Sequence, residues 1–227
     1  MDWMSLLFPK KCVECGKIGG YVCEKCEVGL WEEEQICPQC WRVSRYGLRH
    51  KFCREPYGME GLTCFWAYEG IARKLIKQAK DRFYFDLLGE LLRDVNNRVS
   101  EMPEYSGLNG FMKKRPVIVP VPLYPKREKE RGFNQADVIG RLVADRWSLE
   151  TNNLLSRVKD TGKQARRDRA QRRNAMRDAF KIKTKDRLPT TVLLVDDVWI
   201  SGATMNECAG VLKQAGVGSV WGLVLAR

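Results

Sequence analysis

The sequence lacks a long apolar run and has a single histidine among its 227 residues. No stretch approaches the ~18 apolar residues that a membrane-spanning helix needs. The apolar start at residues 3–8 is too short for a signal peptide, and no basic segment precedes it. We therefore expect a cytoplasmic protein without membrane insertion. Seven Trp, eight Phe and seven Tyr exclude a low-complexity disordered chain.

Cysteine is nearly absent from the second part of the chain, and a basic excess is absent from the first part. Eight of the nine cysteines lie at or before Cys64, which leaves only Cys208. Residues 1–70 contain nine Lys or Arg against ten Asp or Glu, whereas residues 71–227 contain 31 against 18. We predict a cysteine-rich module over residues 1–60 and a basic domain over residues 61–227.

The cysteine-rich module contains four pairs of candidate metal ligands at the spacing of zinc knuckles. Structural zinc takes four such ligands in a tetrahedron, and the two thiolates of a Cys-x-x-Cys turn converge on one ion. The spacing predicts one or two structural zinc ions, a first bound by Cys12, Cys15, Cys23 and Cys26, and a second bound by Cys37, Cys40, His50 and Cys53. Because protein ligands would fill every position, we expect no metal catalysis there.

Several alternatives remain for these cysteines. A crossed pairing of alternate knuckles would use the same eight ligands. Disulfides would suit a secreted domain, but no export signal is seen and cytosolic thiols stay reduced. A redox protein rarely needs three successive Cys-x-x-Cys pairs. His50 lies between Arg49 and Lys51 and could be a solvated surface residue, whereas Cys64 and Cys208 are expected in the core.

Apolar periodicity predicts the fold of the basic domain. A strand over 63–68 precedes helices over 70–80 and about 83–99, and the Pro- and Gly-rich residues 100–114 are predicted to form a loop. Buried strands are then predicted at 116–119, 192–195 and 219–225, and they alternate with helices at 133–147 and 204–215. A basic segment at 166–177 is predicted to be partly helical. This order predicts an α/β fold with a parallel sheet flanked by helices. Residues 61–114 would form a helical hood or linker, and residues 115–227 the core.

The most informative segment is an apolar strand that ends in Asp196 and Asp197 and continues into the loop Ile200-Ser201-Gly202-Ala203-Thr204. Ligands of α/β proteins bind at the carboxyl ends of parallel strands. Loop amides, a helix N-terminus and hydroxyl groups can together hold a phosphate. The two carboxylates suit ribose hydroxyls or a Mg²⁺ ion reached through water. The alternative is an Asp pair that caps a helix.

This segment resembles the signature of the type I phosphoribosyltransferases, which bind phosphoribosyl pyrophosphate (PRPP) together with Mg²⁺. Further motifs resemble the ComF family of competence-associated proteins, and these are residues 68–70, 119–123, Arg127, 131–136, Gln164, 172–174, 179–180 and 225–227. The cysteine pairs are similar to that family's double zinc ribbon. The likeness runs almost from end to end of the chain, so it implies a phosphoribosyltransferase-like fold.

The resemblance also implies roles for single positions. Asp196 and Asp197 would face the 2- and 3-hydroxyls of the ribose, and residues 200–204 would hold the 5-phosphate. The turn Pro120-Val121-Pro122-Leu123 would present N–H groups to the diphosphate, and residues 166–174 would occupy the position of the mobile active-site loop. Ile200 departs from the pattern, because relatives in purine salvage have an acidic catalytic residue there and Ile200 cannot accept a proton. No catalytic residue is therefore assigned.

Two basic clusters fit a polyanion, either the phosphates of PRPP or a nucleic-acid backbone. One lies at residues 126–131 and the other at residues 157–177, and their candidate nucleic-acid contacts are Lys126, Arg127, Arg131, Arg166, Arg167, Arg172 and Arg173. The aromatic residues Trp31, Trp41 and Phe52 could stack on unpaired bases or could pack around a small zinc core.

Two functions follow from these observations. The resemblance implies a PRPP-binding protein that contacts single-stranded DNA during DNA uptake, with a helicase or translocase of the uptake machinery as a partner. The alternative is an active phosphoribosyltransferase that uses a nucleobase or an amine as acceptor and has no DNA role. The missing base at Ile200 favours the first function, whereas the intact phosphate-binding segment is compatible with both.

Overall fold

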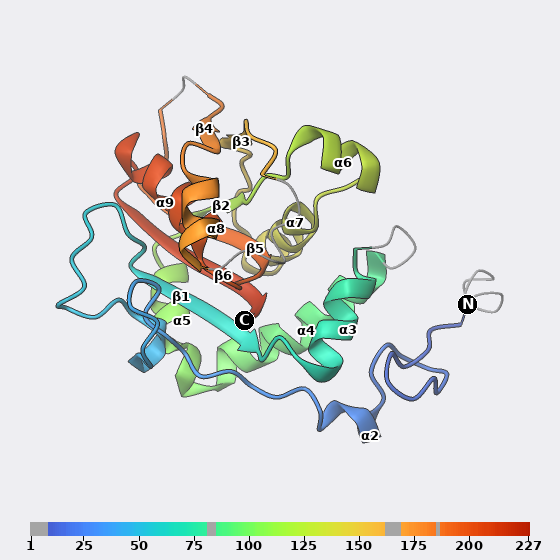
Figure 1. Cartoon of the computed structure of the whole chain (residues 1–227). Coiled ribbons are helices and arrows are strands. Elements are labelled where there is room, and N and C mark those ends of the chain that lie inside the picture. The colour runs from blue at the N-terminus through green and yellow to red at the C-terminus, as the bar shows by residue number, and fades with distance from the viewer. Residues whose placement is uncertain (1–8, 81–84, 162–168, 185–186) are drawn as a thin grey trace.

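A parallel four-stranded sheet forms the centre of the computed structural model, which describes residues 9–80, 85–161, 169–184 and 187–227 (Figure 1). The strand order is β1-β6-β5-β2. The strands span Gly61–Trp66 (β1), Ser219–Ala226 (β6), Thr191–Val198 (β5) and Val117–Pro120 (β2). All three pairings are parallel. The α/β fold with a parallel sheet flanked by helices is thus confirmed.

Alternate residues of the strands point to opposite faces of the sheet, and both faces are covered. Leu193 and Val195 of β5 belong to one buried cluster, whereas Val192 and Leu194 belong to the other. All four side chains are fully buried. Strands buried on both faces are continuous apolar runs, which explains why β5 and β6 are recognisable in the sequence.

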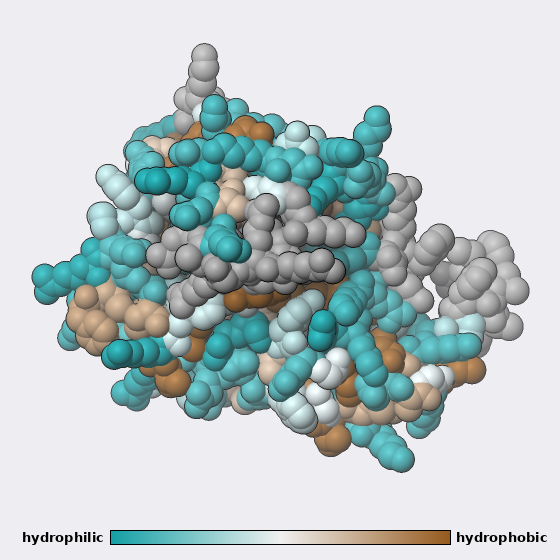
Figure 2. All heavy atoms as spheres, viewed as in Figure 1, coloured by the Kyte–Doolittle hydropathy of each residue, from teal (hydrophilic) through white to brown (hydrophobic). Residues whose placement is uncertain are grey.

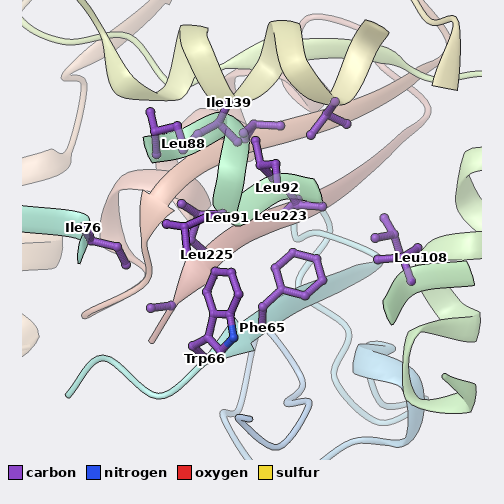
Figure 3. Close-up of a cluster of buried hydrophobic side chains, with 14 of the residues drawn as sticks. Phe65, Trp66, Ile76, Leu88, Leu91, Leu92, Leu108, Ile139, Leu223 and Leu225 are labelled. Carbon is purple, nitrogen blue, oxygen red and sulfur yellow. The ribbon is translucent and has the colours of Figure 1, made fainter. Parts of the chain in front are cut away.

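Helices α4 (Phe85–Glu101) and α7 (Gln135–Trp147) cover the first face, together with α3 (Gly70–Gln78) and α5 (Ser106–Met112). In Figure 3, Phe65 and Trp66 of β1 and Leu223 of β6 point toward Leu92 of α4 and Ile139 of α7. These side chains are almost completely buried, and large-to-small changes in such a core typically cost ~2–5 kcal/mol.

The second face is covered by α9 (Ala203–Gln214), α8 (Arg169–Met176) and a small antiparallel pair of strands, β3 (Leu155–Arg157) and β4 (Phe180–Ile182). Helix α6 (Pro125–Arg131) follows β2 and lies near the carboxyl edge of the sheet (Figure 1). Short helices complete the chain, namely α2 (Glu24–Glu27), η1 (Arg45–Gly47) and η2 (Pro103–Tyr105).

The cysteine-rich module runs along one side of the sheet (the lower edge in Figure 1) and is attached by polar contacts. Near its start, Lys10 pairs with Asp86 at 2.8 Å and with Glu90 at 3.0 Å. Farther along, the amide of Gln35 exchanges two hydrogen bonds with the backbone of Cys64 in β1. The predicted boundary after residue 60 is untested by this packing and stays a prediction.

One prediction of local structure is wrong. Residues 100–114 were expected to form a loop, but the structure has the end of α4, then η2 and α5 in this segment. Gly107 and Gly110 lower intrinsic helix propensity, and tertiary packing overrides it. A Cβ atom at Gly107 would lie 2.3 Å from the carbonyl oxygen of Tyr46, so glycine permits α5 to approach η1 closely. Strands β3 and β4 and helix α6 were also not predicted.

Candidate functional site

A cavity of about 410 Å³ opens at the carboxyl ends of β2 and β5. Its lining comes from the turn after β2, the starts of α7 and α9, the end of β5, and residues of α6 and β3. The lining residues are Tyr68, Lys80, Val121, Pro122, Leu123, Arg127, Arg131, Asn134, Gln135, Ala136, Arg157, Asp196, Asp197, Val198, Trp199, Ile200, Ser201, Gly202, Thr204 and Met205. The carboxyl edge of a parallel sheet is the usual ligand-binding position of this fold class.

The two aspartates at the end of β5 have different electrostatic surroundings. Burial and the adjacent charge of Asp197 raise the pKa of Asp196 to about 8. The Asp196 carboxylate also accepts a hydrogen bond from the N–H of Asp197 at 2.9 Å. Asp197 itself pairs with Lys80 Nζ at 2.9 Å. Burial thus favours the protonated form of one carboxyl group, while its neighbour is held by a cation.

Four cations surround this pair of carboxyls, namely Lys80, Arg127, Arg131 and Arg157. Burial lowers the pKa of Arg157, and the neighbouring Arg127 acts in the same direction. Two arginine side chains that lie near each other although their positive charges repel indicate an environment arranged for an anion. Among the described residues, Arg157 Nε and Gln135 Nε2 are buried donors without a hydrogen-bond partner. Such orphaned donors require an explanation, and an anionic ligand would supply acceptors.

The loop before α9 is shaped by Trp199 and Gly202. The side chain of Trp199 is buried, and Gly202 adopts a left-handed conformation with φ of 63° directly above it. A Cβ atom at Gly202 would lie 2.3 Å from the Trp199 ring. Only glycine fits this position at low cost. The first N–H groups of α9 have no partners within the helix. That of Ala203 makes a long contact of 3.5 Å with Ser201 Oγ, for which a phosphate oxygen in the loop would be a stronger acceptor.

The turn after β2 is fixed by Asn134, which begins α7. Asn134 Oδ1 accepts from the N–H of Ala136 at 3.1 Å, as a helix N-cap does. Its Nδ2 donates to the carbonyl of Val121 at 2.9 Å. The N–H of Val121 donates to Val195 on β5. One side chain therefore couples the turn, the helix and the sheet at the edge of the cavity.

The structure brings nine of the eleven predicted PRPP-binding residues to this cavity, while Pro120 and Ala203 are buried and do not line it. Arg127 and Arg131, predicted to contact nucleic acid, also line it, whereas Lys126 is exposed outside it. Arg166 and Arg167 lie outside the described residues. The backbone of Arg172 and Arg173 belongs to α8, and their side chains are likewise outside the description.

Sequence reasoning did not assign Tyr68, Lys80, Gln135 or Arg157 to the PRPP site. Lys80 was only one of four cations on a helix face, and Arg157 was only part of a basic cluster. Their proximity to the aspartates depends on how α3 and β3 pack on the sheet. No pattern within either segment reveals that contact.

The eight predicted metal ligands form two separate clusters, Cys12, Cys15, Cys23 and Cys26, and Cys37, Cys40, His50 and Cys53. Within each cluster the ligand atoms all lie within 4.8 Å of one another. A tetrahedral zinc site with Zn–S bonds of ~2.3 Å needs sulfur atoms about 3.8 Å apart, and Cys15 and Cys23 are 3.6 Å apart. The geometry fits two zinc ions, and it excludes the crossed pairing.

The surroundings of the ligand atoms also fit zinc. Burial opposes ionisation of Cys12, but N–H groups of Cys15, Cys23 and Glu14 bond to its sulfur and lower its pKa to about 6. In the second cluster, His50 Nδ1 lies 3.2 Å from Cys40 Sγ, while its Nε2 lies 3.2 Å from the carbonyl of Val43. That second contact fixes the ring so that Nδ1 faces the metal position. Cys64 and Cys208 are buried in the core, as predicted.

The second cysteine cluster touches the loop of the cavity. The rings of Trp41, which follows Cys40, and Trp199 are 5.5 Å apart and tilted by 47°. Trp41 adopts φ of 67°, at the position where the first knuckle has Gly16 with φ of 75°. A bulky residue in this conformation is unusual and points to a constraint beyond the knuckle itself. The Trp199 contact is such a constraint.

Several known proteins are similar in sequence to this chain. Competence protein F of Haemophilus influenzae is 40% identical over 115 residues, 48% of this chain and 50% of that protein, so the alignment spans about half of the relative. Competence protein ComFC of Bacillus subtilis is 25% identical over 227 residues, 95% of this chain and 85% of that protein. DNA utilization protein YhgH of Salmonella typhimurium is 26% identical over 215 residues, 91% of this chain and 90% of that protein.

The chain is thus similar over most of its length to the ComFC and YhgH proteins, and over about half of its length to competence protein F. The relationship covers most of the chain, and the parallel sheet with its N-terminal cysteine clusters agrees with the phosphoribosyltransferase-like fold of the ComF family. No family model matches the chain. Within the described residues, none of the helices has the length and apolarity to cross a bilayer.

We expect about two zinc ions per chain by elemental analysis of the purified protein. Cys12→Ser and Cys37→Ser should each lower the content to about one, because each variant removes a ligand from a different cluster. Cys64→Ser is the matched control, since its sulfur is in the core and outside both clusters. A wild-type protein without zinc, or variants that both keep two ions, would contradict the assignment.

We expect Trp41→Gly to keep both zinc ions, because glycine accepts the left-handed conformation. Loss of the ring contact should cost about 2 kcal/mol, less than the ~3–5 kcal/mol of a fully buried tryptophan. It should also accelerate amide hydrogen exchange at residues 199–204 several-fold. Trp31→Ala removes an exposed tryptophan of the same module and is the control. Exchange in the loop that equals the wild-type rate would show that Trp41 does not support it.

Proposed function

We propose that this protein binds PRPP with Mg²⁺ in the cavity at the carboxyl edge of the sheet and contacts single-stranded DNA during DNA uptake. The observation that carries the ligand proposal is the convergence of an aspartate pair, a phosphate-type loop and four cations on one cavity. Each of these groups comes from a different element, and together they match a sugar that bears phosphates at two positions.

Charge supports an anionic ligand. Lys80, Arg127, Arg131 and Arg157 outnumber the two aspartates, one of which has a pKa raised to about 8. The cavity therefore has a positive charge near pH 7, which PRPP would neutralise with its phosphate and diphosphate. Asp160, whose Oδ1 lies 3.8 Å from Arg127 Nε, offsets part of the repulsion between the arginines, and an anionic ligand would offset more of it.

Roles within the cavity follow from position. Residues 200–204 would hold the 5-phosphate, and Asp196 and Asp197 would accept hydrogen bonds from ribose hydroxyls. The turn at Val121–Leu123, with Arg127 and Arg131 beside it, would hold the diphosphate. The unpartnered Arg157 Nε and Gln135 Nε2 would gain acceptors. Mg²⁺ would supply charge compensation for the diphosphate.

The DNA part of the proposal is supported by the relatives, which are named as competence and DNA utilization proteins. Basic residues extend from the cavity outward, since Arg127 lines it while Lys126 and Lys129 of the same helix are exposed. A phosphate backbone is attracted by such a cluster. A helicase or translocase of the uptake machinery is the protein partner that we propose.

A second candidate function is phosphoribosyl transfer to a nucleobase or amine, which the same cavity would accommodate. The observation that favours binding over transfer is Ile200, which lines the cavity and is 57% exposed. Its side chain has no proton acceptor at the position where related transferases have an acidic residue. Release of pyrophosphate from PRPP, measured with and without DNA, distinguishes the two functions.

We expect Asp197→Asn to weaken PRPP binding at least tenfold by calorimetry in the presence of Mg²⁺, because it removes the carboxylate that pairs with Lys80. Asp196→Asn should weaken binding less, because it replaces a carboxyl group whose protonated form is favoured by burial. Asp145→Asn, on the exposed part of α7, is the matched control and should bind normally. Equal affinity for PRPP in all four proteins would refute the assignment of the site.

The Asp196→Asn variant also has a stability signature. The folded-state pKa of Asp196 is above its unfolded value, so the unfolded state loses this proton first and wild-type stability falls as pH rises from about 4 to about 8. Asparagine has no such proton. We therefore expect the variant to melt at a higher temperature than wild type at pH 7.5 and to lose this advantage near pH 4. A lower melting temperature at both pH values would contradict the raised pKa.

We expect single-stranded DNA binding to weaken steeply with salt, by about 0.7 in the log–log slope for each phosphate contact. Changing Arg166, Arg167, Arg172 and Arg173 together to alanine should flatten the slope by up to about 2.8. Changing four exposed lysines elsewhere, namely Lys11, Lys17, Lys25 and Lys183, is the matched control. Fluorescence anisotropy with a labelled oligonucleotide measures both. Absence of binding by the wild type would leave only the PRPP part of the proposal.

A further inference from the structure

A second cavity, of about 600 Å³, lies at the amino edge of the sheet, opposite the proposed PRPP site. We call it the ribbon groove, because one wall belongs to the second cysteine cluster and the other to α5. Its lining residues are Tyr46, Leu48, Arg49, Glu60, Ser106, Gly107, Gly110, Phe111, Lys114 and Trp221. In Figure 1, η1 and α5 lie beside each other next to β1. Neither the relatives' names nor the PRPP proposal accounts for this groove.

The floor of the ribbon groove is built from the buried rings of Trp221 and Phe111, and Tyr46 adds a partly exposed ring. Trp221, near the start of β6, donates its indole N–H to Thr63 Oγ1 at 3.0 Å, and its ring lies 5.4 Å from that of Phe111. Tyr46 forms the ribbon side. The groove is open at Gly110 of α5, whereas Gly107 packs closely against Tyr46 and Trp221. A Cβ atom at Gly110 would meet nothing within 4 Å.

Cations border the aromatic rings. Lys114 Nζ lies 5.5 Å from the centre of the Phe111 ring, and the guanidinium of Arg45 lies 4.7 Å from that of Tyr46. Arg49 also lines the groove. Among the lining residues Glu60 is the one acid, and it pairs with Lys213 and accepts from the N–H of Val220. The groove therefore attracts anions.

The surface beside the ribbon groove has the same character. Residues 42–57 contain five Lys or Arg, one acid and three aromatic residues. Two of these aromatics are exposed to solvent, Phe52 at 68% and Tyr57 at 48%. Figure 2 shows apolar side chains over the loop that leads into β1 (left edge), bordered by hydrophilic ones. Exposed aromatics between cations are the typical surface for unpaired bases and their phosphates.

We propose that the ribbon groove binds single-stranded nucleic acid, with one base against the partly exposed ring of Tyr46 and neighbouring phosphates on Arg49 and Lys114. An acidic peptide would use the cations but would leave the flat aromatic rings without a matching partner. This inference rests on the DNA-binding part of the proposed function. It places a DNA contact at the amino edge of the sheet, opposite the proposed PRPP site. A strand that used both edges would pass around the molecule.

The test is fluorescence anisotropy with a labelled oligo-dT, titrated over salt. The double variant Arg49→Ala/Lys114→Ala should bind at least tenfold more weakly and lose about 1.4 in the log–log salt slope, because two phosphate contacts disappear. Lys17→Ala/Lys25→Ala removes two exposed lysines of the first cysteine cluster and should behave as wild type. Since Arg49 also donates to the carbonyl of Glu55, Lys114→Ala alone should lose about 0.7.

Filling the groove separates stacking from charge. Gly110→Leu should place a side chain over the aromatic floor, lower the affinity several-fold and leave the salt slope unchanged. PRPP binding should stay normal in every groove variant, because the two cavities lie at opposite edges of the sheet. Normal PRPP binding also shows that each variant is folded.

The outcomes distinguish the two proposals. If the wild type binds no oligonucleotide, the DNA part of the proposed function fails together with this inference. If the wild type binds and the groove variants bind equally well, the inference alone is overturned, and the contacts belong to the basic residues near the PRPP cavity. If an acidic polyglutamate displaces oligo-dT from the wild type but Gly110→Leu has no effect, the groove recognises charge and not bases, which also overturns it.

Discussion

The position of β5 determines the geometry on which the proposed ligand site depends. Its central residues are buried on both faces, so the strand cannot shift or rotate without exposing apolar surface on one of them. The end of the strand therefore delivers Asp196 and Asp197 to a fixed point. The N–H of Val121 bonds to Val195 and aligns the turn after β2 with that point, and Gly202 lets the next loop fold back over Trp199. Rigid strands place polar groups that loops alone would leave adaptable.

Placing charges at this point is costly for the fold. Burial and mutual repulsion raise the pKa of Asp196, and burial with Arg127 lowers the pKa of Arg157. Both shifts mean that the charged forms are disfavoured in the ligand-free protein. Strained electrostatics of this kind are typical of functional sites, because a structural ion pair would be arranged to satisfy its own partners. Lys80 relieves only part of this strain, through Asp197.

The sequence predicts those features that are local or periodic. The buried strands, the amphipathic helices and the ligand spacing of the cysteines each leave a pattern within a few residues, so the parallel sheet and both metal clusters were predictable. The helices within residues 100–114 were not predictable, because glycine usually indicates a loop. Here Gly107 instead allows close packing against Tyr46. Lys80 and Arg157 were missed as cavity residues for a similar reason. Lys80 contacts Asp197, which is more than a hundred residues away in the chain, and Arg157 lies near Asp196, about forty residues away. No local sequence pattern encodes such contacts.

The second cysteine cluster links the two edges of the sheet. Trp41 packs against Trp199 in the loop of the proposed PRPP cavity, while Tyr46 and Arg49, a few residues later, line the ribbon groove. Both contacts depend on how the segment from Cys37 to Cys53 is folded, and a module of this size has too little core to hold that fold alone. A zinc ion in this cluster would therefore order residues that contribute to both sites. The first cluster differs, because it packs on α3 and α4 through Lys74 and Lys10. The two cysteine clusters resemble each other in ligand spacing, but among the described residues it is the second cluster whose segment contributes to both surfaces where we propose that ligands bind.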